Sequence, residues 1–214
     1  MKGPRTNERV TWDEFLDLDL DLDGGSEGRY EFHDGELVAM AGATPTHALL
    51  AGRWVTRLSV ALEGRPCEVY DSSLLVALLA TRRGLHPDAS VICGAPEYTE
   101  GDERGILNPS LIVEVLSPST ELFDRGEKFR LYQQIVSLHT YVLVSQRLAC
   151  VEVFTRSGEG WLYRSYGPGE MFRLPHLGVE IEVDRLYRGV LPTPEAPAVA
   201  SGEAVASVGV SRGG

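Results

Sequence analysis

The chain has 214 residues and a mass of 23.4 kDa, a length that fits one domain with extra terminal segments. Hydrophobic residues make up 43% of it and charged residues 24%, which excludes a chain that is mainly disordered, collagen-like or coiled-coil. No apolar run approaches the ~20 residues that cross a bilayer, and the N-terminus lacks the apolar segment of a secretory signal. We therefore expect a folded cytoplasmic protein with no membrane partner.

The charge of the chain is strongly acidic and unevenly placed. The formal net charge is −11, and the first 36 residues alone hold eleven acids against four bases. This balance argues against a simple nucleic-acid-binding surface, because Lys and Arg supply most of the affinity for phosphate. A DNA partner would need a metal ion or a local rim of arginines. The candidates for such a rim are Arg53, Arg57, Arg82, Arg83, Arg125 and Arg130.

The three cysteines, Cys67, Cys93 and Cys150, are odd in number and lie far apart. We interpret them as three buried thiols, in keeping with a reducing compartment. Neither the cysteines nor the five histidines form a C-x-x-C or H-x-x-x-H pair, so a structural zinc site has no support.

The N-terminal third carries the clearest local signals. Thr11 and Glu14 have the spacing of a capping box and predict a short helix. The alternating Asp and Leu of residues 17–23 lead into Gly24 and favour an acidic loop. Residues 30–33 and 36–40 flank Asp34-Gly35, the signature of a two-residue type I′ hairpin.

The remaining pattern predicts an α/β fold. Apolar spacing indicates a helix over residues 46–62, with Gly64 at its end, and a second helix over 123–135. Strands are predicted at 67–79, 85–93, 111–116, 140–144, 150–155 and 161–166. We expect one mixed β-sheet flanked by helices within residues 1–188, and a disordered low-complexity tail over 189–214.

Glu114 is the first candidate for chemistry. It interrupts Leu111-Ile112-Val113-Glu114-Val115-Leu116, which otherwise reads as a buried central strand. An ionised carboxylate is costly to bury alone, so a cation or strong donors should lie beside it. A metal would serve, and the alternative is an arginine in a structural ion pair.

Asp88 is the second candidate, because it follows Pro87 and opens another strand-like run 26 residues before Glu114. This separation suits neighbouring strands, on which the two carboxylates could face one another. Such a pair fits Mg²⁺ or Mn²⁺, which keep several waters and need few protein ligands. Asp88 as a plain turn residue after proline is the alternative.

Lys128 is the third candidate. The chain has 18 arginines and two lysines, and the other lysine is Lys2. Lys128 shares a helical face with Asp124, Leu131 and Tyr132, which places its ammonium beside the apolar stripe. There it could orient water or stabilise developing charge. The alternative is a surface ion pair with Asp124.

Several segments together resemble a known family. They are the segment 30–37 (YEFHDGEL), Pro87-Asp88, the segment 112–120 (IVEVLSPST) and the segment 124–128 (DRGEK) with Tyr132. Over residues 11–187 the chain is similar to the Uma2 family, also called DUF820, of restriction-endonuclease-like proteins. The resemblance implies the PD-(D/E)XK nuclease fold, a metal-dependent endonuclease and a DNA substrate.

The resemblance also carries residue roles. It implies that Asp88 and Glu114 are the catalytic and metal-binding acids. The usual lysine position, two after the glutamate, is Leu116 here, so the resemblance is to branches in which the lysine has moved to the next helix, at Lys128. Glu36 and His47 match positions typical of the family near the cleft.

The sequence thus predicts Mg²⁺-dependent hydrolysis of DNA phosphodiester bonds by Asp88, Glu114 and Lys128. A homodimer is expected, because cutting both strands commonly needs two active sites. The alternative is a catalytically inactive nuclease-fold module that binds DNA or protein, which the net acidity and Leu116 favour.

Overall fold

The computed structural model describes residues 9–21, 29–40, 42–100 and 102–191. Its central sheet has six strands in the order β12-β11-β10-β9-β6-β3. Only β9 and β10 run parallel among them, and the other neighbours are antiparallel. The bounds are β3 (Cys67–Asp71), β6 (Ala89–Cys93), β9 (Leu111–Leu116), β10 (Thr140–Ser145), β11 (Val151–Ser157) and β12 (Gly160–Tyr166).

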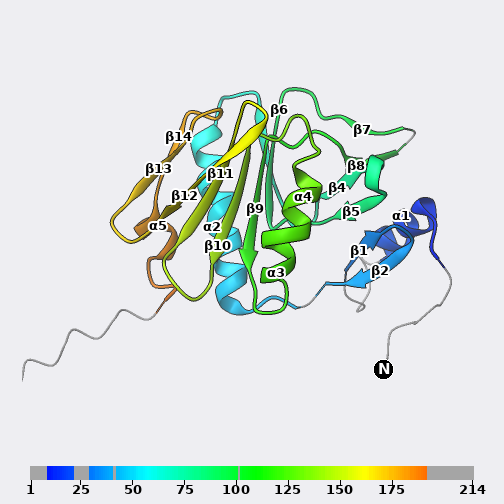
Figure 1. Ribbon diagram of the computed structural model, residues 1–214, viewed down its shortest axis with the longest axis horizontal. Coiled ribbons are helices and arrows are strands. Elements are labelled where there is room, and N and C mark those ends of the chain that lie inside the picture. Colours follow the sequence, from blue (N-terminus) through cyan, green and yellow to red (C-terminus); the bar gives the residue numbers. More distant parts are fainter. Residues whose placement is uncertain (1–8, 22–28, 41, 101, 192–214) are drawn as a thin grey trace, which may run out of the picture.

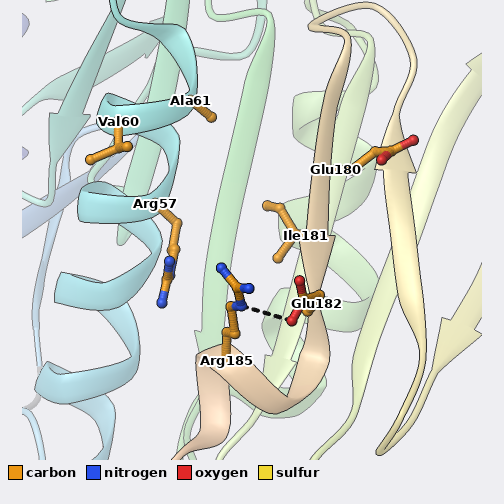
Figure 2. A pocket seen from close by; sticks show the side chains of 7 residues that line it. All are labelled: Arg57, Val60, Ala61, Glu180, Ile181, Glu182 and Arg185. Carbon is orange, nitrogen blue, oxygen red and sulfur yellow. Dashed lines mark ion pairs between the residues drawn. The ribbon is translucent and has the colours of Figure 1, made fainter.

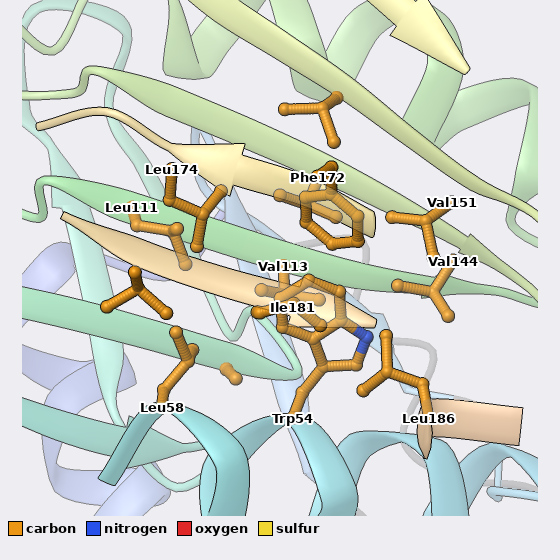
Figure 3. Packing of buried hydrophobic residues seen from close by; sticks show 14 of the residues in the cluster. Trp54, Leu58, Leu111, Val113, Val144, Val151, Phe172, Leu174, Ile181 and Leu186 are labelled. Carbon is orange, nitrogen blue, oxygen red and sulfur yellow. The ribbon is translucent and has the colours of Figure 1, made fainter. Parts of the chain in front are cut away.

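Helix α2 (Pro45–Leu62) covers one face of this sheet. The Thr44 hydroxyl caps its first turn by accepting a hydrogen bond from the His47 N–H at 3.1 Å, and Pro45 stands where its missing N–H costs nothing. Leu50, Trp54 and Leu58 recur at helical spacing and are fully buried. Figure 3 shows Trp54 and Leu58 packed beneath β9 and the hairpin of β13 (Met171–Leu174) and β14 (Val179–Glu182).

A second helical segment covers the opposite face of β9. It runs through α3 (Glu121–Phe123), a π-helical turn (Asp124–Lys128) and α4 (Phe129–Tyr132), and lies in front of the sheet in Figure 1. Leu131 and Tyr132 pack there on Ile112 and Leu116 of β9. Strand β9 is therefore buried on both faces, as its continuous apolar run predicted.

The N-terminal segment forms a unit at the edge of the molecule. Helix α1 (Trp12–Asp21) begins with the predicted capping box, in which the Glu14 N–H donates to the Thr11 hydroxyl at 3.2 Å. Strands β1 (Tyr30–His33) and β2 (Glu36–Ala39) form the predicted hairpin, and both turn residues have positive φ, 50° at Asp34 and 93° at Gly35. Phe15, Leu16, Phe32 and Leu75 form the buried N-terminal cluster that joins these elements.

Strand β1 continues into a second sheet of six strands, in the order β2-β1-β5-β4-β8-β7. The additional bounds are β4 (Leu75–Leu78), β5 (Arg83–Leu85), β7 (Tyr98–Thr99) and β8 (Asp102–Ile106). The last helix among the described residues is the short α5 (Val183–Tyr187), which lies beside α2. Among the described residues, no helix is both long and apolar enough to span a membrane.

The predicted mixed α/β fold class is confirmed, and several boundaries are corrected. The acidic segment is helical as far as Asp21 instead of forming a loop, and the rest of it lies outside the described residues. A turn divides the predicted strand 67–79 into β3 and β4, and Pro87, which has no N–H to donate, separates β5 from β6. Strands β7 and β8 lie in a region for which no strand was predicted. The second helix spans 121–132 instead of 123–135. The predicted tail lies outside the described residues from 192 onward.

The prediction of three buried thiols is wrong. Cys67 and Cys93 form a disulfide, and the free Cys150 is half-buried. The reason is the register of β3 and β6, which places these two residues directly opposite each other across the antiparallel pair. This pairing depends on strand register, which the spacing of the cysteines does not reveal.

Candidate active site

The geometry around Glu114 follows from strand alternation. Leu111, Val113 and Val115 face α2, so Glu114 points with Ile112 and Leu116 to the side of the π-helical turn and α4. Its side chain is almost fully buried, and its Oε1 accepts a hydrogen bond from the Tyr132 hydroxyl at 3.1 Å. Burial raises the pKa of the Glu114 carboxyl well above its usual range, against the opposing charge of Lys128. The charge of the Glu114 carboxylate therefore depends on a neighbouring cation.

Lys128 supplies the cation that the sequence predicted beside Glu114. Its Nζ lies 2.9 Å from Glu114 Oε1, and only 5% of the residue is exposed. Asp124, one turn earlier, is 3.9 Å away and is itself buried, so the alternative of a surface ion pair does not describe Lys128. Burial opposes the charge of Lys128, but Glu114, Glu31 and Asp124 raise the pKa of its ammonium well above the usual range. Lys128 remains charged.

The π-helical turn explains how Lys128 reaches this position. A π-helical turn contains one more residue than an α-helical turn, and such turns often occur at functional sites. The Asp124 carbonyl is bound by the Tyr141 hydroxyl from β10 at 2.9 Å, and the Asp124 carboxylate accepts from the Thr120 hydroxyl at 2.7 Å. These contacts fix the backbone carbonyl and the carboxylate of Asp124, and the Lys128 side chain points toward Glu114.

Asp88 lies between Pro87 and the start of β6, close to β9. Its Oδ2 accepts a hydrogen bond from the Val115 N–H at 2.6 Å, and Ala89 stands opposite Val113 in the antiparallel pair. The negative charge of Asp88 also raises the pKa of the Glu114 carboxyl, although burial and the charge of Asp124 raise it more. The predicted approach of Asp88 to the strand of Glu114 is therefore present, and the description of Asp88 as a turn residue alone is insufficient.

His47, which the family resemblance placed near the cleft, lies next to Asp88. Its Nε2 is 2.7 Å from Asp88 Oδ1, and its Nδ1 is 3.3 Å from the Gln146 amide nitrogen. The Thr44 hydroxyl donates to the Gln146 carbonyl oxygen at 2.6 Å, which directs the amide nitrogen to His47. Because an amide nitrogen only donates, Nδ1 is the acceptor and a neutral His47 donates from Nε2 to Asp88.

Glu36, the other residue that the resemblance placed near the cleft, is exposed on β2 opposite His33. Among the described residues it forms no hydrogen bond or ion pair with Asp88, Glu114 or Lys128. The structure instead brings Glu31 of β1 into the group, with its Oε1 3.1 Å from Lys128 Nζ. Burial alone would raise the pKa of Glu31, but Lys128 and His33 lower it to about 2, so this carboxylate is ionised.

Sequence reasoning missed Glu31, Gln146 and the role of Tyr132. One signal for Glu31 was available: the hairpin requires alternate residues to face opposite sides, and Phe32 is apolar, so Glu31 and His33 must share the other side. Gln146 gave no signal, because its contact with His47 spans 99 positions of the chain.

Three of the six arginines proposed as a basic rim are paired with acids. Arg82 lies 3.2 Å from Asp34, Arg83 lies 3.4 Å from Glu127, and Arg125 contacts both Glu121 and Glu152. Arg53 donates to the Leu186 carbonyl. These arginines therefore serve local ion pairs and hydrogen bonds.

The donor atoms of Asp88 and Glu114 fit a hard divalent cation with a water-rich coordination shell. Each Asp88 oxygen accepts one hydrogen bond and retains a lone pair, and Glu114 Oε2 accepts none from the described residues. The described residues contain no group of three His, Cys, Asp or Glu side chains that could hold a metal. Mg²⁺ needs only one or two protein carboxylates, because it keeps several of its waters.

A surface pocket elsewhere does not share residues with this site. Figure 2 shows it between α2, β14 and α5, with Arg57 and Arg185 on its walls. Arg185 pairs with Glu182 at 2.7 Å, and Glu180 lies at the rim. Its charges are mixed, and nothing in it resembles the buried group around Lys128.

The fold is shared with a solved structure. A crystal structure described as a "putative nuclease belonging to DUF820", from Anabaena variabilis, superposes with a TM-score of 0.67. It is 16% identical, and the match covers 85% of this chain and 99% of that one. The likeness shows that the two chains share a fold, in agreement with the mixed α/β fold predicted from the sequence.

Sequence comparison places the chain in a family. Residues 12–185 match Uma2, described as "Putative restriction endonuclease", and the chain belongs to this family. Two relatives from Synechocystis are both described as uncharacterized proteins. Protein slr1290 is 35% identical over 76% of this chain and 85% of its own length, and sll1609 is 33% identical over 62% and 75%.

Proposed function

We propose that this protein is a metal-dependent endonuclease that hydrolyses phosphodiester bonds of DNA. The observation that supports the proposal best is the convergence of Asp88, Glu114 and Lys128 from three separate elements. One buried lysine lies 2.9 Å from a buried glutamate, whose strand also binds the aspartate through the Val115 N–H. Perturbed and mutually coupled ionisable groups of this kind concentrate at functional sites.

Asp88 and Glu114 would hold the ion, Mg²⁺ or Mn²⁺, through the lone pairs that remain free. When bound, such an ion lowers the pKa of a coordinated water and neutralises charge on the phosphate.

Lys128 would assist the reaction itself, and His47 would position Asp88. In hydrolysis water adds to phosphorus, the bond to the leaving oxygen breaks, and the leaving oxygen gains a proton. The Lys128 ammonium has three donors and would orient the attacking water or bind the phosphoryl oxygen on which charge develops. His47 would hold Asp88 in place through its Nε2. A homodimer, in which each copy cuts one strand, is part of the proposal.

Conversion of supercoiled plasmid to nicked or linear DNA, with Mg²⁺ or Mn²⁺, tests the proposal. We expect EDTA to abolish cleavage, and Asp88→Asn and Lys128→Met each to lower its rate by about 100-fold or more. Asp13→Asn, at an exposed position of α1, and Lys2→Met are the matched controls and should cleave like the wild type. If wild type and variants leave DNA equally intact across metals and substrates, the proposal fails in favour of a module that binds without cleaving.

A further inference from the structure

Glu31 reaches the candidate site from the N-terminal hairpin, a part of the chain remote from Asp88 and Glu114. Strand alternation directs Phe32 into the N-terminal cluster with Phe15 and Leu75, and directs Glu31 and His33 to the opposite side. Trp12 and Phe15 both contact the Phe32 ring, at centroid distances of 5.4 and 5.3 Å. The packing of α1 on the hairpin therefore fixes where Glu31 points.

Both oxygens of Glu31 are occupied by protein donors. Oε1 lies 3.1 Å from Lys128 Nζ and accepts the His86 backbone N–H at 3.4 Å, and Oε2 lies 3.3 Å from His33 Nε2. Only 7% of the residue is exposed. A carboxylate held in this way is suited to fixing a neighbour in place.

The neighbour that Glu31 fixes is the Lys128 ammonium. Glu31 Oε1 and Glu114 Oε1 both lie within hydrogen-bond distance of Nζ, at 3.1 and 2.9 Å, whereas Asp124 is farther away at 3.9 Å. A lysine side chain has four flexible torsions and no fixed direction at its end. Two acceptors from different elements restrict Nζ far more than Glu114 alone would.

We propose that Glu31 is a positioning residue that holds the Lys128 ammonium against Glu114, so that the N-terminal hairpin completes the site. The consequence for catalysis rests on the proposed nuclease function. The positioning itself does not, and it can be measured without substrate.

The presence of only two lysines makes a direct spectroscopic test possible. In the full chain labelled with ¹⁵N-lysine, a buried and hydrogen-bonded ammonium should give a slowly exchanging N–H signal from Lys128. The signal should persist in Lys2→Met. We expect Glu31→Gln to shift this signal or broaden it beyond detection, and Glu180→Gln, at an exposed position of β14, to leave it unchanged. An absent signal in the wild type, or an unchanged one in Glu31→Gln, would overturn the inference.

Glu31→Asp covers the case in which Glu31→Gln fails to fold. Aspartate keeps the carboxylate but is shorter by one methylene group, so the carboxylate lies farther from Lys128. The Lys128 signal should therefore shift in the folded variant, and an unshifted signal counts against the inference. Cleavage kinetics give the second measurement. Loss of a residue that orients a catalytic group typically costs 10- to 100-fold, and we expect that loss in kcat with KM unchanged.

The two proposals fail in different ways. If no DNA is cut by the wild type but the Lys128 signal depends on Glu31, the nuclease function is wrong and the positioning stands. If the wild type cuts DNA and Glu31→Gln has the same kcat and the same signal, the positioning is wrong and the nuclease function stands.

Discussion

The two faces of strand β9 differ in what they bury. On the α2 side, Leu111, Val113 and Val115 meet Trp54 and Leu58 in an entirely apolar core. On the other side, Ile112 and Leu116 flank Glu114, which lies in an ion-paired group beneath α4. Buried ion pairs are often no more stabilising than apolar residues of similar volume. The first face therefore supplies stability, and stability alone does not account for the charges of the second face.

The largest expected effect comes from breaking the apolar face. Trp54→Ala should lower the free energy of unfolding by about 4 kcal/mol, because it leaves a large cavity in a fully buried position. Among the described residues the Trp54 indole N–H has no hydrogen-bond partner, so the loss includes no broken hydrogen bond. Urea denaturation measures it. Leu49→Ala, at a half-exposed position of the same helix, should change the value by under about 1 kcal/mol. Equal effects of the two variants would contradict the assignment of the core.

The next effect comes from breaking the polar face. Lys128→Met should destabilise the protein by about 3 kcal/mol, because Glu31 and Glu114 lose their shared cation. Adding Glu31→Gln and Glu114→Gln to Lys128→Met should recover part of that loss, because the buried negative charges are then removed as well. Denaturation of the single and the triple variant tests this. A triple variant less stable than Lys128→Met would show that the group is stabilising as a whole.

The two faces also differ in how much of each could be predicted from the sequence. The apolar face follows from periodicity, and β9 and α2 were predicted almost to the residue. On the polar face, Glu114 and Lys128 stood out because a charge within an apolar pattern requires a partner. Which partner it meets depends on tertiary geometry. The π-helical turn, the contact of Glu31 with Lys128 and the pairing of Cys67 with Cys93 all depend on register or on local helix geometry, which local patterns do not encode.

The polar face should also make the stability of the protein depend on pH at low pH, because Glu31 is ionised in the folded chain. The pKa of its carboxyl falls from an ordinary value of 4.5 to about 2 in the folded chain. Its stabilising contribution is therefore complete above about pH 4.5 and disappears as the pH falls to 2, because the unfolded chain binds the proton first. The shift corresponds to a contribution on the order of 3 kcal/mol. Stability measured by denaturation from pH 5 to pH 2 should decline less steeply in Glu31→Gln, and equal slopes would contradict the ionised state of Glu31.

The smallest expected effect on stability concerns Gln146, whose amide contacts the His47 ring beside Asp88. Gln146→Ala removes the donor to His47 Nδ1 and the hydrogen bond to the Leu116 carbonyl at 2.9 Å, so stability should fall by about 1 kcal/mol. Gln146→Glu replaces that donor with an acceptor and should draw the proton to Nδ1, which leaves Nε2 without a hydrogen for Asp88 unless the ring becomes doubly protonated. NMR of the His47 ring nitrogens distinguishes these states. Retention of a neutral ring with the proton on Nε2 in Gln146→Glu would show that Asp88 alone determines the tautomer.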